Sequence, residues 1–154
     1  MTFRGSSAHG ELVALYAEVD ALLAPFGCAG TAECCTFSNT GREPYPTAVE
    51  LAGVELAIAE RGGARALLRR PDKRRLALAD DRRCPLLSSD GRCRIYALRP
   101  FGCRTFFCDR RTGDDPWPRE ELLALGARLS DLSARAFPRD PRPRPLLNAL
   151  ARLT

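Results

Sequence analysis

The chain has 154 residues, of which 45% are hydrophobic and 28% are charged, a balance typical of one soluble globular domain. No run approaches the roughly 20 apolar residues of a membrane-spanning helix, so we expect no membrane partner. The N-terminus turns acidic within its first apolar stretch and lacks a signal-peptide core, which favours a cytoplasmic location. The net charge of +5 is weak evidence for nucleic-acid binding without a reading motif.

Residues 11–26 are predicted to form an amphipathic helix that is ended by Pro25 and Gly27. Its apolar residues recur at the three- and four-residue spacing of one helix face. They are Leu12, Leu15, Tyr16, Val19, Leu22 and Leu23.

A loop rich in glycine, asparagine and proline follows, and a second helix begins after it. Thr47 and Glu50 have the spacing of a capping box, in which each side chain satisfies a free backbone N–H of the first turn. We expect this helix to run to about Arg61, where two glycines end it. A shorter helix over residues 64–70 is expected to end before Pro71.

Small strand segments are predicted in the middle of the chain. Residues 74–79 alternate between apolar and polar side chains, which indicates a short strand. The sequence Ser-Asp-Gly at residues 89–91 is a tight-turn signal between residues 85–87 and 93–96, and it predicts a small hairpin.

A break at residues 112–116 precedes a second amphipathic helix, residues 118–137, for which Pro118 suits the first turn. Four prolines make residues 138–145 a stiff extended linker. Residues 146–154 are expected to dock back on the body of the protein.

The predicted fold is therefore mainly α with small irregular β, in a single domain that spans residues 1–154. Its core is residues 10–137, followed by the linker and the C-terminal docking segment. We expect a helical frame of three to four helices around two metal-binding cysteine loops, residues 28–35 and 84–108.

Seven cysteines dominate the search for a site, and an odd number in a reducing compartment favours metal ligation over disulfides. Thiolates suit zinc or iron, as a mononuclear site, a dinuclear site or an iron–sulfur cluster. One structural site with three buried thiols is the alternative, and adjacent cysteines point in different directions in regular backbone. The candidate metal ligands are Cys28, Cys34, Cys35, Cys84, Cys93, Cys103 and Cys108.

These motifs resemble the YkgJ-type cysteine-cluster family, whose signature begins with CxxCxxCC and ends with CPxL…DGxCxIYxxRPxxCR. The second block is nearly complete here, as Cys84-Pro85-Leu86-Leu87, Gly91-Arg92-Cys93, Ile95-Tyr96, Arg99-Pro100 and Cys103-Arg104. The resemblance spans about residues 28–108, and it implies zinc or iron chelation.

The first motif departs from the family pattern, because Thr31 stands where the second cysteine is expected. A hydroxyl is a poor substitute for a thiolate, so one metal could keep an open position for water, a substrate or Glu33. An open position is what a catalytic metal requires. Equally, the missing cysteine need not be a ligand.

Residues around the cysteines have predicted supporting roles. Arg99 and Arg104 are expected to donate to backbone carbonyls, or else to offset thiolate charge. Tyr96 and Phe101 are predicted to shield the site from water. The single histidine, His9, is expected to be exposed rather than a ligand, and Trp117 to pack at a helix start.

Three functions compete. The first is a metal-binding protein whose structural ion or cluster helps to present a surface to a protein or small-molecule partner. The second is a metal-dependent enzyme with an open position near Thr31, and the third is a zinc-stabilised interaction module. Nucleic acid is the less favoured partner. Its case rests on basic residues without interleaved aromatic residues. They are Arg69, Arg70, Lys73, Arg74, Arg75, Arg82 and Arg83.

Overall fold

A computed structural model describes residues 2–26, 32–68, 82–105 and 117–154. Within these ranges the protein is mainly helical, as predicted. The α-helices are α1 (Ser7–Leu23), α2 (Phe37–Thr40), α3 (Ala48–Glu60), α4 (Ala64–Leu67), α5 (Phe101–Thr105), α6 (Arg119–Ala136) and α7 (Leu146–Ala151). None of them is long and apolar enough to cross a membrane.

The predicted β-structure is not found in the described part of the chain, where pairing is limited to two isolated bridges, Thr36 with Arg83 and Leu87 with Cys93. The turn signal was correct, because Gly91 takes a φ of +79° and its N–H donates to the Ser88 carbonyl at 3.1 Å. Backbone hydrogen bonds of 2.9 Å run from Ser88 to Arg92 and from Arg94 to Leu86 across this turn, so the predicted hairpin is reduced to a single bridge. The strand predicted at residues 74–79 and the break at residues 112–116 lie outside the described residues.

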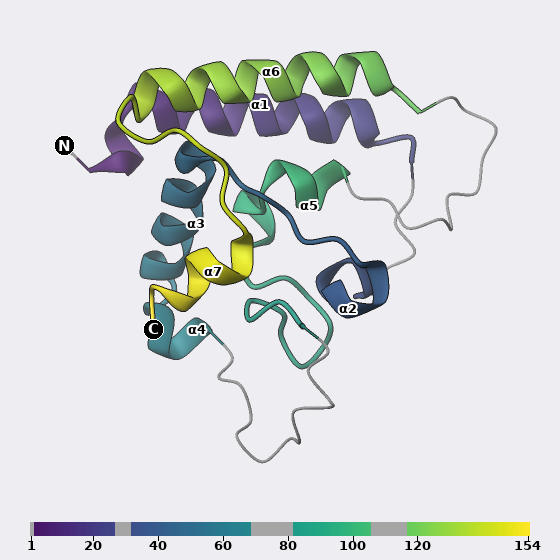
Figure 1. Cartoon of the computed structure of the whole chain (residues 1–154), viewed down its shortest axis with the longest axis vertical. Helices are drawn as coiled ribbons and strands as arrows, with labels where there is room; N and C mark the ends of the chain where they lie inside the picture. Colours follow the sequence, from purple (N-terminus) through teal and green to yellow (C-terminus); the bar gives the residue numbers. More distant parts are fainter. Residues whose placement is uncertain (1, 27–31, 69–81, 106–116) are drawn as a thin grey trace.

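The long helices α1 and α6 lie side by side along one edge of the molecule (Figure 1). Their facing residues form the first core, which includes Leu12, Leu15, Val19, Leu125 and Leu129. The bounds of α6 confirm the helix predicted at residues 118–137. By contrast, α1 begins four residues before its predicted start, because the Ser6 hydroxyl accepts from the His9 N–H at 3.2 Å and caps the helix there.

Helix α3 confirms the predicted capping box of Thr47 and Glu50 and ends at Glu60, before two glycines with positive φ. The short helix after it is α4, which is ended by extended backbone at Leu68. Residues 69–70, which the sequence assigned to the same helix, lie outside the described ranges. Helix α2 forms where a loop was predicted, and Gly41, with a φ of +63°, ends it after one turn.

A second core lies between α3, α4, α7 and the cysteine segments, and it includes Phe37, Leu86, Ile95, Leu146 and Leu150. Helix α7 covers it after an extended stretch that runs beside residues 44–46 (Figure 1). Arg144 and Leu146 donate backbone N–H groups to the carbonyls of Pro46 and Pro44, each at 3.0 Å. Because prolines have no N–H, this pair of segments bonds in one direction only.

Candidate metal centre

Three separate segments bring five cysteines to the second core. Cys34 and Cys35 lie in the 3-10 turn Glu33–Cys35, Cys84 and Cys93 lie on either side of the 88–92 turn, and Cys103 is the third residue of α5. Cys84 is buried in the core, and Cys35 and Cys93 pack against it. Among the described residues, cysteines of both predicted loops therefore lie near the same core.

The main chain joins the first two segments. Cys84 donates its N–H to the carbonyl of Cys35 at 2.7 Å, and Phe37 donates to the carbonyl of Arg82 at 3.2 Å. The bridge between Thr36 and Arg83 lies between these bonds. The backbones of the two segments are thus paired next to Cys35 and Cys84.

The five thiols are close enough to influence one another's ionisation. The charge of Cys34 raises the pKa of each of the other four cysteines. Cys103 responds in the same way to Cys84 and Cys93. Mutual repulsion of this kind requires that the sulfur atoms share one small region.

Cys34 and Cys35 form a coupled pair with opposite shifts. A hydrogen bond with Cys35 lowers the pKa of the Cys34 thiol to about 6, against the effect of its burial, and Arg99 contributes in the same direction. The same hydrogen bond and burial raise the pKa of Cys35. Cys34 is therefore the thiolate of the pair, and Cys35 is the S–H donor.

The remaining thiols are held neutral. Burial is the largest cause that raises the pKa of Cys84, to about 12, and burial also raises the pKa of Cys93 and Cys103. Neighbouring cysteines add to each shift. A metal ion would therefore displace protons from these thiols when it binds, as thiolate ligation requires.

The donor set fits a soft metal in kind, because clustered thiols suit zinc and iron. Among the described residues, however, no three ligating side chains converge closely enough to enclose an ion. Cys28 and Cys108, together with Thr31 of the predicted open position, lie outside the described ranges. The structure thus shows a gathered set of donors and not a closed coordination sphere.

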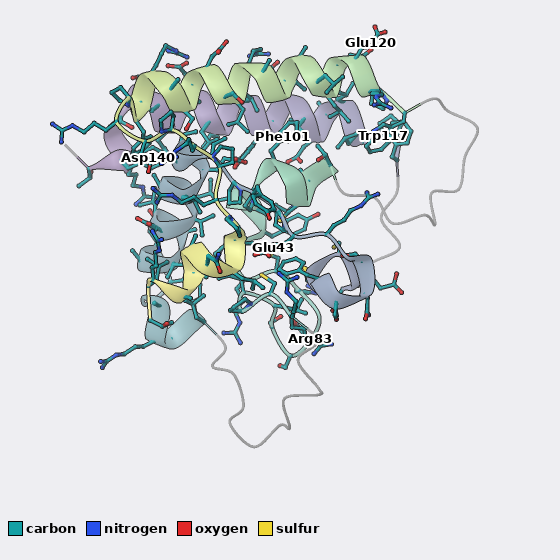
Figure 2. All side chains as sticks on the ribbon, in the orientation of Figure 1. Glu43, Arg83, Phe101, Trp117, Glu120 and Asp140 are labelled. Carbon is teal, nitrogen blue, oxygen red and sulfur yellow. The ribbon has the colours of Figure 1, made fainter. Side chains whose placement is uncertain are left out.

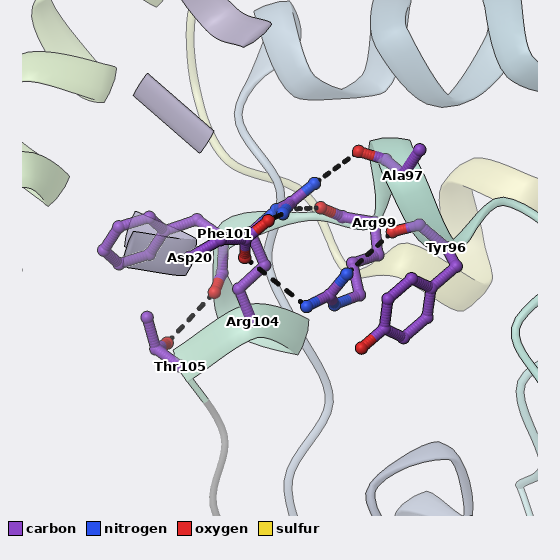
Figure 3. A network of polar contacts seen from close by, with 7 residues as sticks. All are labelled: Asp20, Tyr96, Ala97, Arg99, Phe101, Arg104 and Thr105. Atoms are coloured by element: carbon purple, nitrogen blue, oxygen red, sulfur yellow. Dashed lines mark hydrogen bonds and ion pairs between the residues drawn. The ribbon is translucent and has the colours of Figure 1, made fainter. Parts of the chain in front are cut away.

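The two arginines of the second motif have different surroundings (Figure 3). Arg104 is almost fully buried, and its guanidinium donates to the carbonyls of Arg99, at 2.9 Å, and Ala97 and to Asp20 at 2.5 Å. Arg99 stacks on the Tyr96 ring, 3.8 Å from its centre, and also bonds Asp20 at 3.5 Å. Its charge lowers the pKa of Cys34 and opposes the rise at Cys93. Arg104 is thus the structural arginine, and Arg99 offsets thiolate charge.

The residues predicted to shield the site contact other groups. Tyr96 is 63% exposed, and its ring packs on the Arg99 guanidinium. Phe101 packs against the first core, on the side of α1 and α6. Trp117 does pack at the start of α6, where it meets Phe26 edge to face at 5.1 Å (Figure 2). His9 is half-buried against Phe3, away from the cysteines.

The basic residues at positions 69–83 lie only partly within the described ranges. Residues 69–81 lie outside the described ranges, and Arg82 forms an ion pair with Glu43 at 2.5 Å. Glu43 also accepts the backbone N–H of Leu147 at 2.7 Å, beside α7 in Figure 2. Its charge is among the causes that raise the pKa of Cys84. Glu43 thus links the cysteine segment to the C-terminal helix.

Sequence reasoning missed four polar residues that hold helices and cysteine segments together. They are Tyr16, Asp20, Glu43 and Glu50, of which Glu50 was assigned only to a helix cap. Tyr16 was placed in the core for its apolar ring, and Asp20 has the pattern of a solvated helix residue. A buried carboxylate can be inferred only once its donors from other segments are known.

Comparison with protein families gives one match. The sequence model of the CxxCxxCC family, described as "Putative zinc- or iron-chelating domain", covers residues 27–119, more than half of the chain. The matched range contains all seven cysteines. No curated protein and no solved structure matches the chain.

Proposed function

Because the chain belongs to the CxxCxxCC family, we propose that it binds zinc or iron through clustered cysteine thiolates. The observation that carries this proposal is the packing of cysteines from separate segments into one core: Cys84 is buried there, Cys35 and Cys93 pack against it, and the N–H of Cys84 donates to the carbonyl of Cys35 at 2.7 Å. The proposed ligands are drawn from Cys34, Cys35, Cys84, Cys93 and Cys103, with Cys28 and Cys108 completing the set.

The chain supplies both the donors and the charge balance for such a centre. Cys34 offers a thiolate near neutral pH. The buried thiols, such as Cys84, would release their protons when they bind the metal. A four-thiolate zinc site carries two excess negative charges, which Arg99 offsets from close by. The bound ion would add the bonds that join the cysteine segments, and iron would also add redox chemistry.

Two features support a compact centre rather than scattered thiols. Hydrogen bonds between the Cys35 and Cys84 segments fix their register before any metal is considered. The short helix α5 places Cys103 close enough to Cys34, Cys84 and Cys93 for their charges to raise its pKa. Thiols on three pre-positioned segments lose less conformational freedom on binding than thiols on a mobile loop.

Elemental analysis of protein purified without oxygen tests the proposal. We expect at least one zinc or iron per chain, and an iron–sulfur cluster would also give a brown protein. Cys34→Ser and Cys84→Ser should each lower the metal content, whereas Ser88→Ala, in the turn between Cys84 and Cys93, should not. A folded wild-type chain without metal would refute the proposal.

A further inference from the structure

Glu50 is a buried carboxylate that lies between the first turns of two helices. It is 2% exposed and accepts four hydrogen bonds. Its Oε2 accepts from the N–H and the hydroxyl of Thr47, the N-cap residue of α3, at 2.7 and 3.0 Å. Its Oε1 accepts from the Tyr16 hydroxyl of α1 at 3.1 Å and from the N–H of Phe101, the first residue of α5, at 2.6 Å. A carboxylate is tolerated in such a place only when its acceptor sites are filled.

Helix α5 depends on this contact. A helix of five residues is too short to be stable alone, and its first N–H groups have no partner within the helix. Glu50 satisfies one of them at Phe101, two residues before Cys103. Close packing adds to the constraint, because a Cβ added at Gly102 would lie 3.2 Å from the Cβ of Pro44.

Arg104 follows Cys103 in α5 and bonds to Asp20 (Figure 3). Its guanidinium bonds Asp20 of α1 and lies 3.9 Å above the ring of Tyr16. Tyr16 therefore contacts Arg104 through its ring and Glu50 through its hydroxyl. Glu50 of α3 and Asp20 of α1 thus tie α5 to the helical frame, in addition to the bonds of Arg104 to the carbonyls of Ala97 and Arg99.

We infer that Glu50 is a positioning residue of the metal centre, which fixes the start of α5 and so directs the Cys103 thiol toward the other cysteines. The inference rests on the proposed metal binding. Electrostatic attraction does not explain the residue, because a carboxylate and a metal-bound thiolate have charge of the same sign. Its geometry, with donors from α1, α3 and α5 on one side chain, does explain it.

Cobalt(II) is a suitable probe, because it enters zinc and iron thiolate sites and its charge-transfer absorption scales with the number of bound thiolates. The full chain is compared with Glu50→Gln, Cys103→Ser and the double variant. Glutamine keeps the size of Glu50 but replaces one acceptor oxygen with an N–H₂ donor. That donor would face the N–H and O–H groups that now donate to Glu50. Glu55→Gln, an exposed position on the same helix, is the matched control.

Among variants that keep the wild-type circular dichroism, we expect Glu50→Gln to lose about a quarter of the absorption per cobalt, the share of one ligand in a four-thiolate site. Cys103→Ser should lose the same share of the absorption per cobalt. The double variant should lose no more than either single variant, and Glu55→Gln should lose none. A purely stabilising role would lower the denaturation midpoint of Glu50→Gln and leave its cobalt spectrum unchanged. An unchanged spectrum, or losses that add in the double variant, would overturn the inference.

If Glu50→Gln does not fold, Tyr16→Phe provides the test, because it removes one donor from Glu50 and keeps the ring beneath Arg104. We expect Cys103 alone to become reactive to iodoacetamide in the cobalt-loaded variant, and full protection would overturn the inference. A wild-type chain that binds no cobalt would instead refute the metal site itself. Cobalt binding that Cys103→Ser does not alter would refute only the role of Glu50.

Discussion

The N–H of Cys84 donates to the carbonyl of Cys35 at 2.7 Å, although the two cysteines are about fifty positions apart in the chain. This bond and its neighbours at Phe37 and Arg82 align the two motifs through the main chain. Cys84 itself is buried in the second core beside Leu86. The Cys35 and Cys84 segments are thus aligned by contacts that need no metal ligand.

Removal of the metal should leave the helical frame intact. The first core, between α1, α3 and α6, involves no cysteine, so its packing does not depend on ligation. We expect a chelator to strip the metal while far-ultraviolet circular dichroism stays close to that of the loaded protein. Cooperative loss of helix on chelation, as in small zinc fingers, would show instead that the metal supports the whole fold.

Leu150→Ala should destabilise the protein and the metal centre together. Leu150 is 1% exposed in the second core, which also contains Cys84. Removal of its side chain leaves a cavity, which lowers the free energy of unfolding by about 2–5 kcal/mol. Urea denaturation measures this change, and Leu123→Ala, at a position 65% exposed, should change it by less than about 0.5 kcal/mol. Equal effects of the two substitutions would contradict the assigned core.

Arg104→Gln should cost far more stability than removal of a surface arginine. The Arg104 side chain is 1% exposed, and its loss leaves the carbonyls of Ala97 and Arg99 without their donor. We expect a loss of about 2–3 kcal/mol in the free energy of unfolding, from groups left without hydrogen bonds. Arg128→Gln, which breaks an exposed ion pair with Glu18, should leave the denaturation midpoint unchanged. A midpoint of Arg104→Gln like that of Arg128→Gln would refute the structural role of Arg104.

In the metal-free protein Cys34 should be the most reactive thiol near neutral pH. Alkylation requires the thiolate, and a pKa of about 6 makes the thiolate of Cys34 dominant by about ten to one at pH 7. The rate should rise with pH through an ionisation near pH 6 and then level off. Cys84, with a pKa raised to about 12, should react slowly throughout. Peptide mapping after brief iodoacetamide treatment separates the two, and faster labelling of Cys84 would contradict the assignment.

The sequence predicted the long helices well, because periodic leucines and a capping box are local signals. The end of α3 at its glycines and the extent of α6 followed from such signals. The start of α1 was missed, since a serine cap four residues earlier is a weaker signal than an apolar stripe. The turn at Gly91 was found, but the pairing across it is limited to one bridge between Leu87 and Cys93.

Sequence analysis identified the clustered cysteines as candidates but not the residues that support their segments. Their number and spacing, together with the expectation of a reducing compartment, predicted soft-metal ligation. The contacts of Glu50 with Phe101 and of Asp20 with Arg104 join α1 and α3 to a helix many residues later. No local pattern encodes such pairings. The exposure of Tyr96 was missed for the same reason, because stacking on Arg99 places its ring outward.

X-ray absorption at the metal edge of the purified protein tests the central claim most directly, because it counts the atoms bound to the ion. For zinc we expect about four sulfur neighbours at about 2.3 Å, the length of a zinc–thiolate bond. Cys34→Ser or Cys84→Ser should reduce the sulfur count. A first shell made only of oxygen or nitrogen at about 2.0 Å would contradict cysteine ligation and, with it, the proposed function.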